Sequence, residues 1–294
     1  MKKVFLLSFV ALFFVATFSS CFKQADDIYK PKCKIVNIWY DEMTGAADEI
    51  YTYEDKELSK ITYNEDGFYL LITHNKNGTI SEIKAYNATG VPTGESATMT
   101  YDKTLIATMS YIDDGTVYEK YVFTHVDKKI SSIKTYFDEN IFKSKLSKSR
   151  LYKLCFGDPD KFSKLFDIIA SKGLVLDIEL FLTYTGDNLT KIYYEYEDSY
   201  EDYTYTYTQT MEYDNMKNPY FGLNFYLEDF LGYTKNNVTK ITREEVETSP
   251  FWETETYSWV SNYTYQYNKY DFPTSITAEE DGDLWSTFIE YDKK

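Results

Sequence analysis

The chain contains two histidines, His74 and His125, the side chain type that most often binds metals or transfers protons near neutral pH. They occupy matching positions in two copies of one repeat, six residues before Ile80 and five before Ile130. In a meander of strands they would lie about four strands apart, roughly 19 Å at about 4.8 Å per strand. Zinc requires its ligands within about 2.1 Å of one centre. We therefore expect no metal site and interpret both histidines as strand-end residues duplicated with their repeat.

Carboxylates are densest near residue 200. Two of them held about 5 to 9.5 Å apart can hydrolyse a glycosidic bond, but nothing in the sequence selects a pair, and acids beside a tyrosine-rich turn usually form a solvated face. The sequence also has no EF-hand loop, phosphate loop, nucleophile elbow or Cys-x-x-Cys pair. We expect no enzymatic activity, no cofactor and no metal. The acidic cluster comprises Glu195, Glu197, Asp198, Glu201 and Asp202.

Large aromatic side chains fall in or beside the expected loops of the second half of the chain. Exposed rings of this kind can stack on sugars, and this is one interpretation of them. The other is that they cover the ends of a sheet or form cross-strand pairs, which we favour for any single residue. The residues are Tyr220, Phe221, Phe225, Tyr226, Phe230, Phe251, Trp252, Trp259 and Trp285.

Residues 1–20 have the pattern of an export signal. Lys2 and Lys3 precede an apolar stretch over residues 4–18, which is too short and too sharply ended for a spanning helix. The segment Phe18-Ser19-Ser20-Cys21 resembles the bacterial lipobox, in which a signal peptidase cuts before a lipid-modified cysteine. We therefore predict that Cys21 carries acyl chains, which anchor a protein without a spanning helix. A plain secretory signal is the alternative.

A polar tether, residues 21–32, follows the signal. Within it, Gln24, Asp26 and Asp27 resemble the surface-export signal of Bacteroidota lipoproteins. The predicted location is the outer membrane, with the protein held by lipid and displayed on the cell surface. The alternative interpretation of the paired acids is a solvated linker.

The charge of the mature chain excludes some partners. Removal of Lys2 and Lys3 leaves 29 basic and 47 acidic residues, a net charge of −18. Nucleic acids and anionic surfaces need basic patches, so we expect no nucleic-acid partner. Besides Cys21, only Cys33 and Cys155 remain; an exported protein permits a disulfide between them, and two separate thiols are the alternative.

A short motif recurs along the chain with spacings of 22, 25 and 25 residues. A period of this length holds two strands and two turns, that is, one hairpin per repeat. The turns agree, because Asn-Gly and Asp-Gly supply the positive φ angles that tight hairpins need. The four clearest copies are Leu58–Tyr63, Ile80–Tyr86, Leu105–Tyr111 and Ile130–Tyr136.

Tyrosine accounts for 31 of the 294 residues, and Tyr203–Thr208 alternates tyrosine with threonine in strict period two. We predict an all-β fold, an antiparallel up-and-down meander of about sixteen strands that forms a curled sheet or a barrel. Residues 33–294 form one domain, with front strands in 33–137 and rear strands in 174–294.

The segment 138–173 differs, and we predict that it is helical in part. Asp158-Pro159 is an N-terminal signal, Phe162 to Ile169 carries an apolar stripe, and Gly173 is a natural C-cap. We expect this insertion to fill or plug the curved sheet.

The rear half resembles a family of uncharacterised Bacteroidota lipoproteins with a porin-like fold. The resemblance rests on the order of three segments, Tyr213–Tyr220, Lys235–Ile241 and Tyr263–Ile276, and the front repeats resemble the YD-type repeats of bacterial surface proteins. It implies a barrel-like sheet and an envelope location, with no activity and no catalytic residues. A barrel embedded in lipid needs an apolar outer band about 25 Å tall. Alternate positions here are mostly Tyr, Thr, Glu and Lys, so we expect no embedded barrel.

Our leading hypothesis is a non-enzymatic surface lipoprotein that binds a polysaccharide or another extracellular ligand, or that has a structural role. One alternative is a periplasm-facing accessory protein that binds protein partners. The second is a glycan hydrolase.

Overall fold

The computed structural model describes residues 29, 31, 33–137, 178–198, 203–223 and 228–292. Cys21, Gln24, Asp26 and Asp27 lie outside these residues. So do Cys155 and the helix predicted at 158–173, together with the domain boundaries drawn around it. Cys33 is described and is buried.

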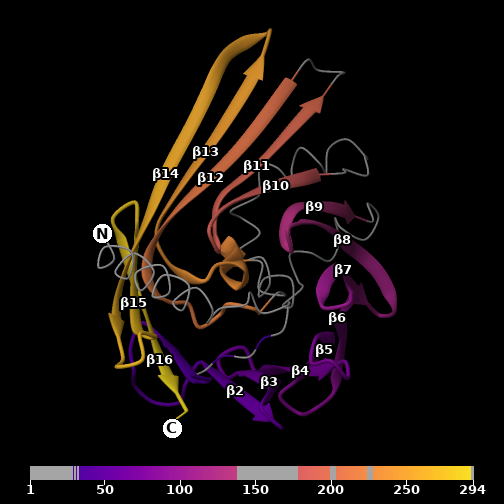
Figure 1. The fold of residues 1–294 in the computed structure, drawn as a ribbon, viewed down its shortest axis with the longest axis vertical. Helices are drawn as coiled ribbons and strands as arrows, with labels where there is room; N and C mark the ends of the chain where they lie inside the picture. The colour runs from indigo at the N-terminus through magenta and orange to yellow at the C-terminus, as the bar shows by residue number, and fades with distance from the viewer. Residues whose placement is uncertain are drawn as a thin grey trace, which may run out of the picture.

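The described residues form a closed barrel in which each strand pairs antiparallel with its neighbours in sequence and β1 pairs with β16 (Figure 1). The predicted all-β meander is therefore confirmed, and the sheet closes fully. The strands are β1 (Ile35–Tyr40), β2 (Glu49–Glu54), β3 (Glu57–Tyr63), β4 (Phe68–His74), β5 (Ile80–Asn87), β6 (Pro92–Asp102), β7 (Leu105–Asp113), β8 (Thr116–Val126), β9 (Lys129–Phe137), β10 (Ile178–Thr185), β11 (Asn188–Asp198), β12 (Tyr203–Lys217), β13 (Asn236–Ser249), β14 (Trp252–Tyr267), β15 (Pro273–Glu280) and β16 (Asp283–Tyr291).

The predicted turns form as expected. Gly67, Gly78, Gly115 and Gly282 all adopt positive φ angles, between 63° and 91°. At these angles a Cβ atom would crowd the backbone, which is why glycine occupies the positions. Because each of these turns closes a hairpin between consecutive strands, the turn residues allow the meander to be predicted from the sequence.

Buried apolar side chains alternate with polar ones along the strands, so the core lies inside the barrel. For example, Ile83 on β5 pairs with Ile72 on β4 and Ala97 on β6, and all three are buried. The neighbouring position on the outer face of β5, Lys84, is exposed and pairs with Glu82. The largest fully buried side chains are Ile35, Ile38, Leu58, Ile61, Leu70, Ile83, Ile106, Met109, Tyr111, Ile133 and Tyr205.

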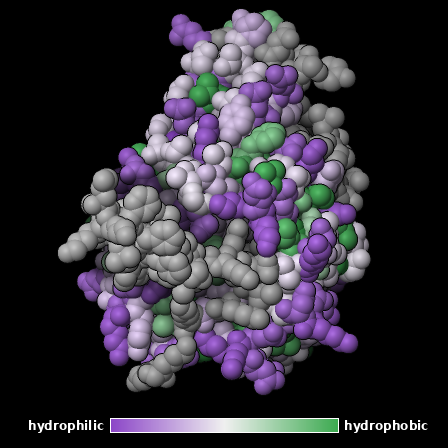
Figure 2. All heavy atoms as spheres, in the orientation of Figure 1, coloured by the Kyte–Doolittle hydropathy of each residue, from purple (hydrophilic) through white to green (hydrophobic). Residues whose placement is uncertain are grey.

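The outer wall is polar. Thr204, Thr206, Thr208 and Thr210 occupy the outward positions of β12 and face Thr248, Val246, Glu244 and Thr242 of β13. In Figure 2 hydrophilic and intermediate side chains cover most of the described surface that is visible, and hydrophobic ones are scattered. The outward positions of β12 and β13, and the described surface visible in Figure 2, therefore show no continuous apolar band of the height that a lipid-embedded barrel needs.

The described part of the chain also contains no helix that is long and apolar enough to cross a membrane.

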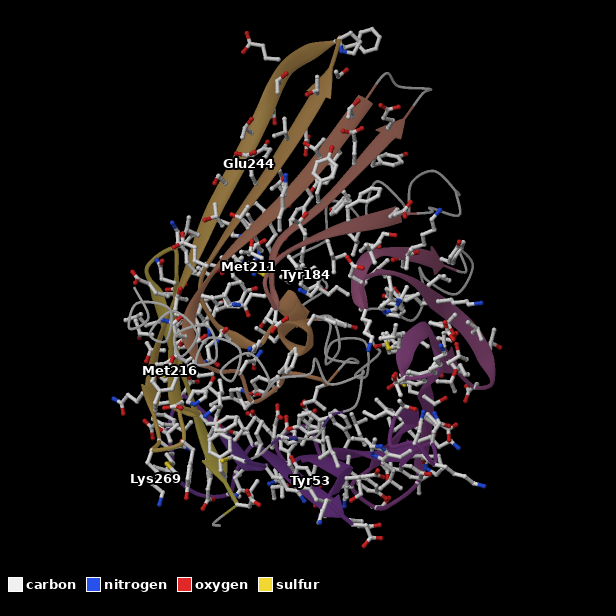
Figure 3. All side chains as sticks on the ribbon, in the orientation of Figure 1. Tyr53, Tyr184, Met211, Met216, Glu244 and Lys269 are labelled. Carbon is white, nitrogen blue, oxygen red and sulfur yellow. The ribbon has the colours of Figure 1, made fainter. Side chains whose placement is uncertain are left out.

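The described parts of the connection between β12 and β13, residues 218–223 and 228–235, fold into the barrel and include the 3-10 helix η3 (Glu228–Tyr233). Tyr220, Leu223 and Tyr233 join the same apolar core as the strands. Figure 1 shows η3 inside the ring of strands, and Figure 3 shows Met211 and Tyr184 close to it. We call residues 218–223 and 228–235 the plug.

Asn218 holds the plug together. Its side-chain amide donates to the carbonyl oxygens of Leu231 and Thr234 at 2.7 and 2.9 Å, and its Oδ1 accepts from the amide of Tyr220 at 2.9 Å. The hydroxyl of Tyr29 donates to the carbonyl of Pro219 at 3.3 Å, which ties the start of the described chain to the plug. The sequence predicts that the insertion at 138–173 fills the sheet; in the described residues this role falls to the plug.

The two ends of the barrel differ. The plug, both described termini and the β2–β3, β4–β5, β6–β7, β8–β9, β10–β11 and β14–β15 turns lie at one end, which we call the plug end. The β1–β2, β3–β4, β5–β6, β7–β8, β13–β14 and β15–β16 turns lie at the opposite end, which we call the far end. β14 has 16 residues and β1 has 6, which correspond to about 50 and 20 Å. The wall of β11–β14 is therefore much taller than the opposite wall (Figure 1).

Candidate binding surface

The structure places the two histidines on β4 and β8, four strands apart as predicted. Nε2 of His74 lies 2.8 Å from the carbonyl oxygen of Leu58, and burial lowers the pKa of His125. Among the described residues there is no group of three or more potential metal ligands. Both histidines therefore lie at or near the ends of their strands, as the repeat predicts.

The acidic cluster does not form a cleft in the described residues. Glu195 and Glu197 are exposed at outward positions of β11, and the hydroxyl of Tyr193 donates to Glu195 at 2.6 Å. Asp198 ends the strand, and Glu201 and Asp202 lie outside the described residues. The two outward carboxylates, Glu195 and Glu197, therefore lie on a solvent-exposed face of the sheet.

The described aromatic residues differ in how far they are exposed. Tyr220 is buried in the plug, where it serves the core. Phe251, in the β13–β14 turn, is 73% exposed, and Trp285, at an inward position on β16 near the far end, is 39% exposed. Phe221 and Trp259 are both half-buried. Phe225, Tyr226 and the side chains of Phe230 and Trp252 lie outside what the structure describes.

The tall wall of β11–β14 carries a concentration of aromatic and polar side chains on its inner face. We call this set the upper inner wall. It is built by the period-two alternation of four adjacent strands, which sends every second side chain inward. Its members are Tyr194, Tyr196, Tyr205, Tyr207, Gln209, Arg243, Glu245, Glu247, Glu255, Tyr257 and Trp259.

The base of the upper inner wall is a buried polar network around Arg243. Its Nη1 donates to Oγ of Ser261 at 2.9 Å and lies 3.5 Å from Oε2 of Glu280, and its Nε donates to Oε1 of Gln209 at 3.3 Å. The hydroxyl of Ser261 donates to Glu280, and that of Tyr207 donates to Gln209 at 2.8 Å. The network therefore joins four consecutive strands, β12 to β15.

Stacked tyrosines lie beside this network. The rings of Tyr194 on β11 and Tyr207 on β12 face each other with centroids 5.1 Å apart and an angle of 19° between their planes. Tyr205 packs against Tyr194 at 5.9 Å. Burial is the main cause that raises the pKa of the Tyr205 hydroxyl. These three rings are buried and form a rigid support beneath the accessible part of the wall.

Above the network the inner face becomes accessible and acidic. Arg243 is 6% exposed, whereas Tyr257, further along the wall towards the far end, is 38% exposed. The hydroxyl of Tyr257 donates to Glu255, and this hydrogen bond is the main cause that raises the pKa of the phenol. Glu245 and Glu247 act on it in the same direction.

This arrangement can bind a ligand, because it offers flat aromatic faces for stacking and carboxylate, amide and hydroxyl groups for hydrogen bonds on a rigid support. Tyrosine–acid pairs two residues apart recur elsewhere in the barrel, as in Tyr51 with Glu49 and Tyr121 with Glu119. They explain why acids so often accompany tyrosines in this sequence.

The sequence pointed to some of these residues and missed others. The alternation of Tyr203–Thr208 showed that one face of this strand is aromatic, and Trp259 stood among the candidate aromatics. Gln209, Arg243, Ser261 and Glu280 were missed. One signal was available, since Arg243 is one of only two arginines and lies within a strand.

Comparisons with known proteins add little. No family model and no curated protein matches the chain. Among solved structures, the chain is similar to a porin-like protein from Bacteroides uniformis, with a TM-score of 0.47 and 12% identity over 90% of this chain and 100% of that one. At that score the likeness carries no argument about function.

Proposed function

We propose that this chain is a lipid-anchored protein of the bacterial outer membrane that binds a polysaccharide at the upper inner wall without altering it. The observation that supports the proposal is the row of rigid inward aromatic rings, from the buried Tyr194 to the accessible Tyr257, beside hydrogen-bonding groups. Sugar rings present apolar faces and hydroxyl groups at the same time, and both features have partners on this surface.

The anchor in this proposal is the acylated Cys21. The polar outer wall supports it, since a barrel with threonines and charges facing outward gains nothing from insertion into hydrocarbon. Gln24, Asp26 and Asp27 support display on the outer face of the membrane. The periplasm-facing accessory protein remains the alternative if this export segment is inactive.

The proposal contains no catalytic step. Ser261 donates to Glu280 and accepts from Arg243, so its hydroxyl has a structural role. Arg243 in turn pairs with Glu280 at 3.5 Å. Since the upper inner wall also carries Glu245, Glu247 and Glu255, a glycan hydrolase is the alternative that the binding experiment should distinguish.

Replacing Tyr257 and Trp259 by alanine should weaken glycan binding by about tenfold or more, because each ring supplies on the order of 1 kcal/mol of stacking. The measurement is the binding of fluorescent oligosaccharides of glucose, mannose and N-acetylglucosamine to intact cells that produce the protein. The matched control is Thr256→Ala with Ser258→Ala, which changes the outward neighbours on the same strand.

Three outcomes would count against the proposal. Equal glycan binding by the two double variants would show that the upper inner wall is not the binding site. Release of shortened sugars would favour the hydrolase. If wild-type cells bind sugar only after permeabilisation, as expected for a variant with Asp26→Ala and Asp27→Ala, the protein faces the periplasm.

A further inference from the structure

The described turns at the two ends of the barrel differ in charge. Six exposed acids and no lysine or arginine lie in the described turns of the far end. Those acids are Asp41, Glu42, Glu65, Asp66, Asp114 and Asp281. Each of five turns at the plug end instead presents an exposed lysine, and these are Lys56, Lys76, Lys103, Lys128 and Lys269.

Exposed acids also lie in three of these plug-end turns, namely Asp55, Asp127 and Asp271, and Asp187 lies in a further turn of this end. Asp187 lies 3.7 Å from Nζ of Lys129 and 3.3 Å from Nζ of Lys235. Asp271 lies 3.0 Å from Nζ of Lys217. Lysines therefore neutralise Asp187 and Asp271, and the five exposed lysines outnumber the two remaining exposed acids of the plug-end turns, Asp55 and Asp127.

Two exposed apolar side chains accompany these lysines. Val126 ends β8 and is 60% exposed, and Tyr270 lies in the β14–β15 turn with Nζ of Lys269 4.9 Å from its ring centre. Tyrosine beside lysine is a combination that suits the boundary between water and lipid headgroups.

The chain also leaves the barrel at the plug end. Tyr29 contacts the plug, and eight residue steps from it to Cys21 span at most about 29 Å. β14 alone is about 50 Å long, so an anchor at Cys21 cannot place the far tip of the tall wall at the bilayer. Lys30, Lys32 and Lys34 add positive charge to this part of the sequence.

We propose that the plug end docks on the anionic headgroups of the bilayer, so that the upper inner wall points away from the membrane. This inference rests on the lipid anchor of the proposed function. Each lysine near an anionic surface contributes about 1 kcal/mol, and the effect falls off within about 8 to 10 Å. The six acids of the far-end turns are beyond that range.

The test is acetylation of lysines in the full lipidated protein, read by mass spectrometry. The protein is placed in phosphatidylcholine vesicles with about 30% phosphatidylglycerol, in pure phosphatidylcholine vesicles, and in neutral detergent micelles. We expect the reactivity of the five turn lysines to be at least roughly threefold lower in the anionic vesicles than in either neutral environment. Lys84 and Lys120, on the outer wall, should react equally in all three.

A pair of variants isolates the charge. Lys76→Glu with Lys103→Glu should abolish protection of the remaining turn lysines, whereas Lys84→Glu with Lys120→Glu should preserve it. Equal reactivity of the turn lysines in anionic vesicles and micelles would overturn the proposal, and so would equal protection in neutral and anionic vesicles. Failure of the wild-type protein to float with vesicles would instead refute the lipid anchor.

Discussion

Replacing Arg243 by methionine should lower the free energy of unfolding by about 3 to 5 kcal/mol. Arg243 is buried and connects Gln209, Ser261 and Glu280 across four strands. Its removal leaves the carboxylate of Glu280 without its cation and the oxygen of Gln209 without one of its donors, and each unmatched buried group costs free energy. The measurement is the urea midpoint followed by tryptophan fluorescence.

The matched control is Lys240→Met on the outer face of the same strand. Lys240 pairs with Glu212 at 3.4 Å, but both side chains are substantially exposed, so its loss should cost less than about 1 kcal/mol. A double variant, Arg243→Met with Glu280→Gln, should recover part of the loss, because it removes the unpaired charge. If Arg243→Met unfolds at the same midpoint as Lys240→Met, the network does not support the tall wall.

Glu119 should make the protein less stable as the pH rises. It lies on the inner face of β8, is 1% exposed, and accepts from the hydroxyl of Tyr121 through one oxygen, while the other oxygen has no hydrogen-bond partner among the described contacts. Burial raises the pKa of this carboxyl from 4.5 to about 8. The folded protein therefore retains a proton on Glu119 that the unfolded chain releases from about pH 4.5 upward.

The direction of the pH dependence follows from this difference in proton binding between the folded and unfolded states. Stability is unaffected by Glu119 below about pH 4.5, falls through the interval up to pH 8, and stays lower above it, by roughly 3 to 5 kcal/mol. Glu119→Gln should remove this fall and raise the melting temperature at pH 9 relative to wild type, with little change at pH 4.5.

Glu195→Gln is the matched control, because Glu195 also accepts from a tyrosine two residues away but is exposed. It should leave the pH dependence of wild type intact. Parallel pH profiles for wild type and Glu119→Gln would show that Glu119 is ionised in the folded state at neutral pH. Burial also raises the pKa of Glu49, so Glu49 contributes its own fall in stability to both wild type and Glu119→Gln.

The sequence predicts the strands well because their signals are local. Alternation within Tyr203–Thr208 and the glycines of the tight turns need only neighbouring residues. Closure of the barrel is different, since it depends on the pairing of β1 with β16, where Asn37 contacts Glu290 across 253 positions at 2.8 Å. No local pattern encodes that register.

The positions of the plug and of the candidate surface also depend on long-range pairing and could not be predicted from local sequence. The segment from Asn218 to Tyr220 has the composition of an exposed loop, yet it is buried because the barrel surrounds it. Likewise Gln209, Arg243, Ser261 and Glu280 each look ordinary on their own strands, and only the register brings them together.

The most direct test of the account asks whether lipid alone holds the protein in the membrane. Residues 1–21 are replaced by a secretory signal with its own cleavage site, and the envelope is separated into soluble and membrane fractions. The account predicts that wild type, labelled with radioactive palmitate at Cys21, stays in the membrane fraction, whereas the replaced form is soluble and folded without detergent. Retention of the replaced form in the membrane, or its need for detergent, would show that the barrel itself is embedded and would contradict the account.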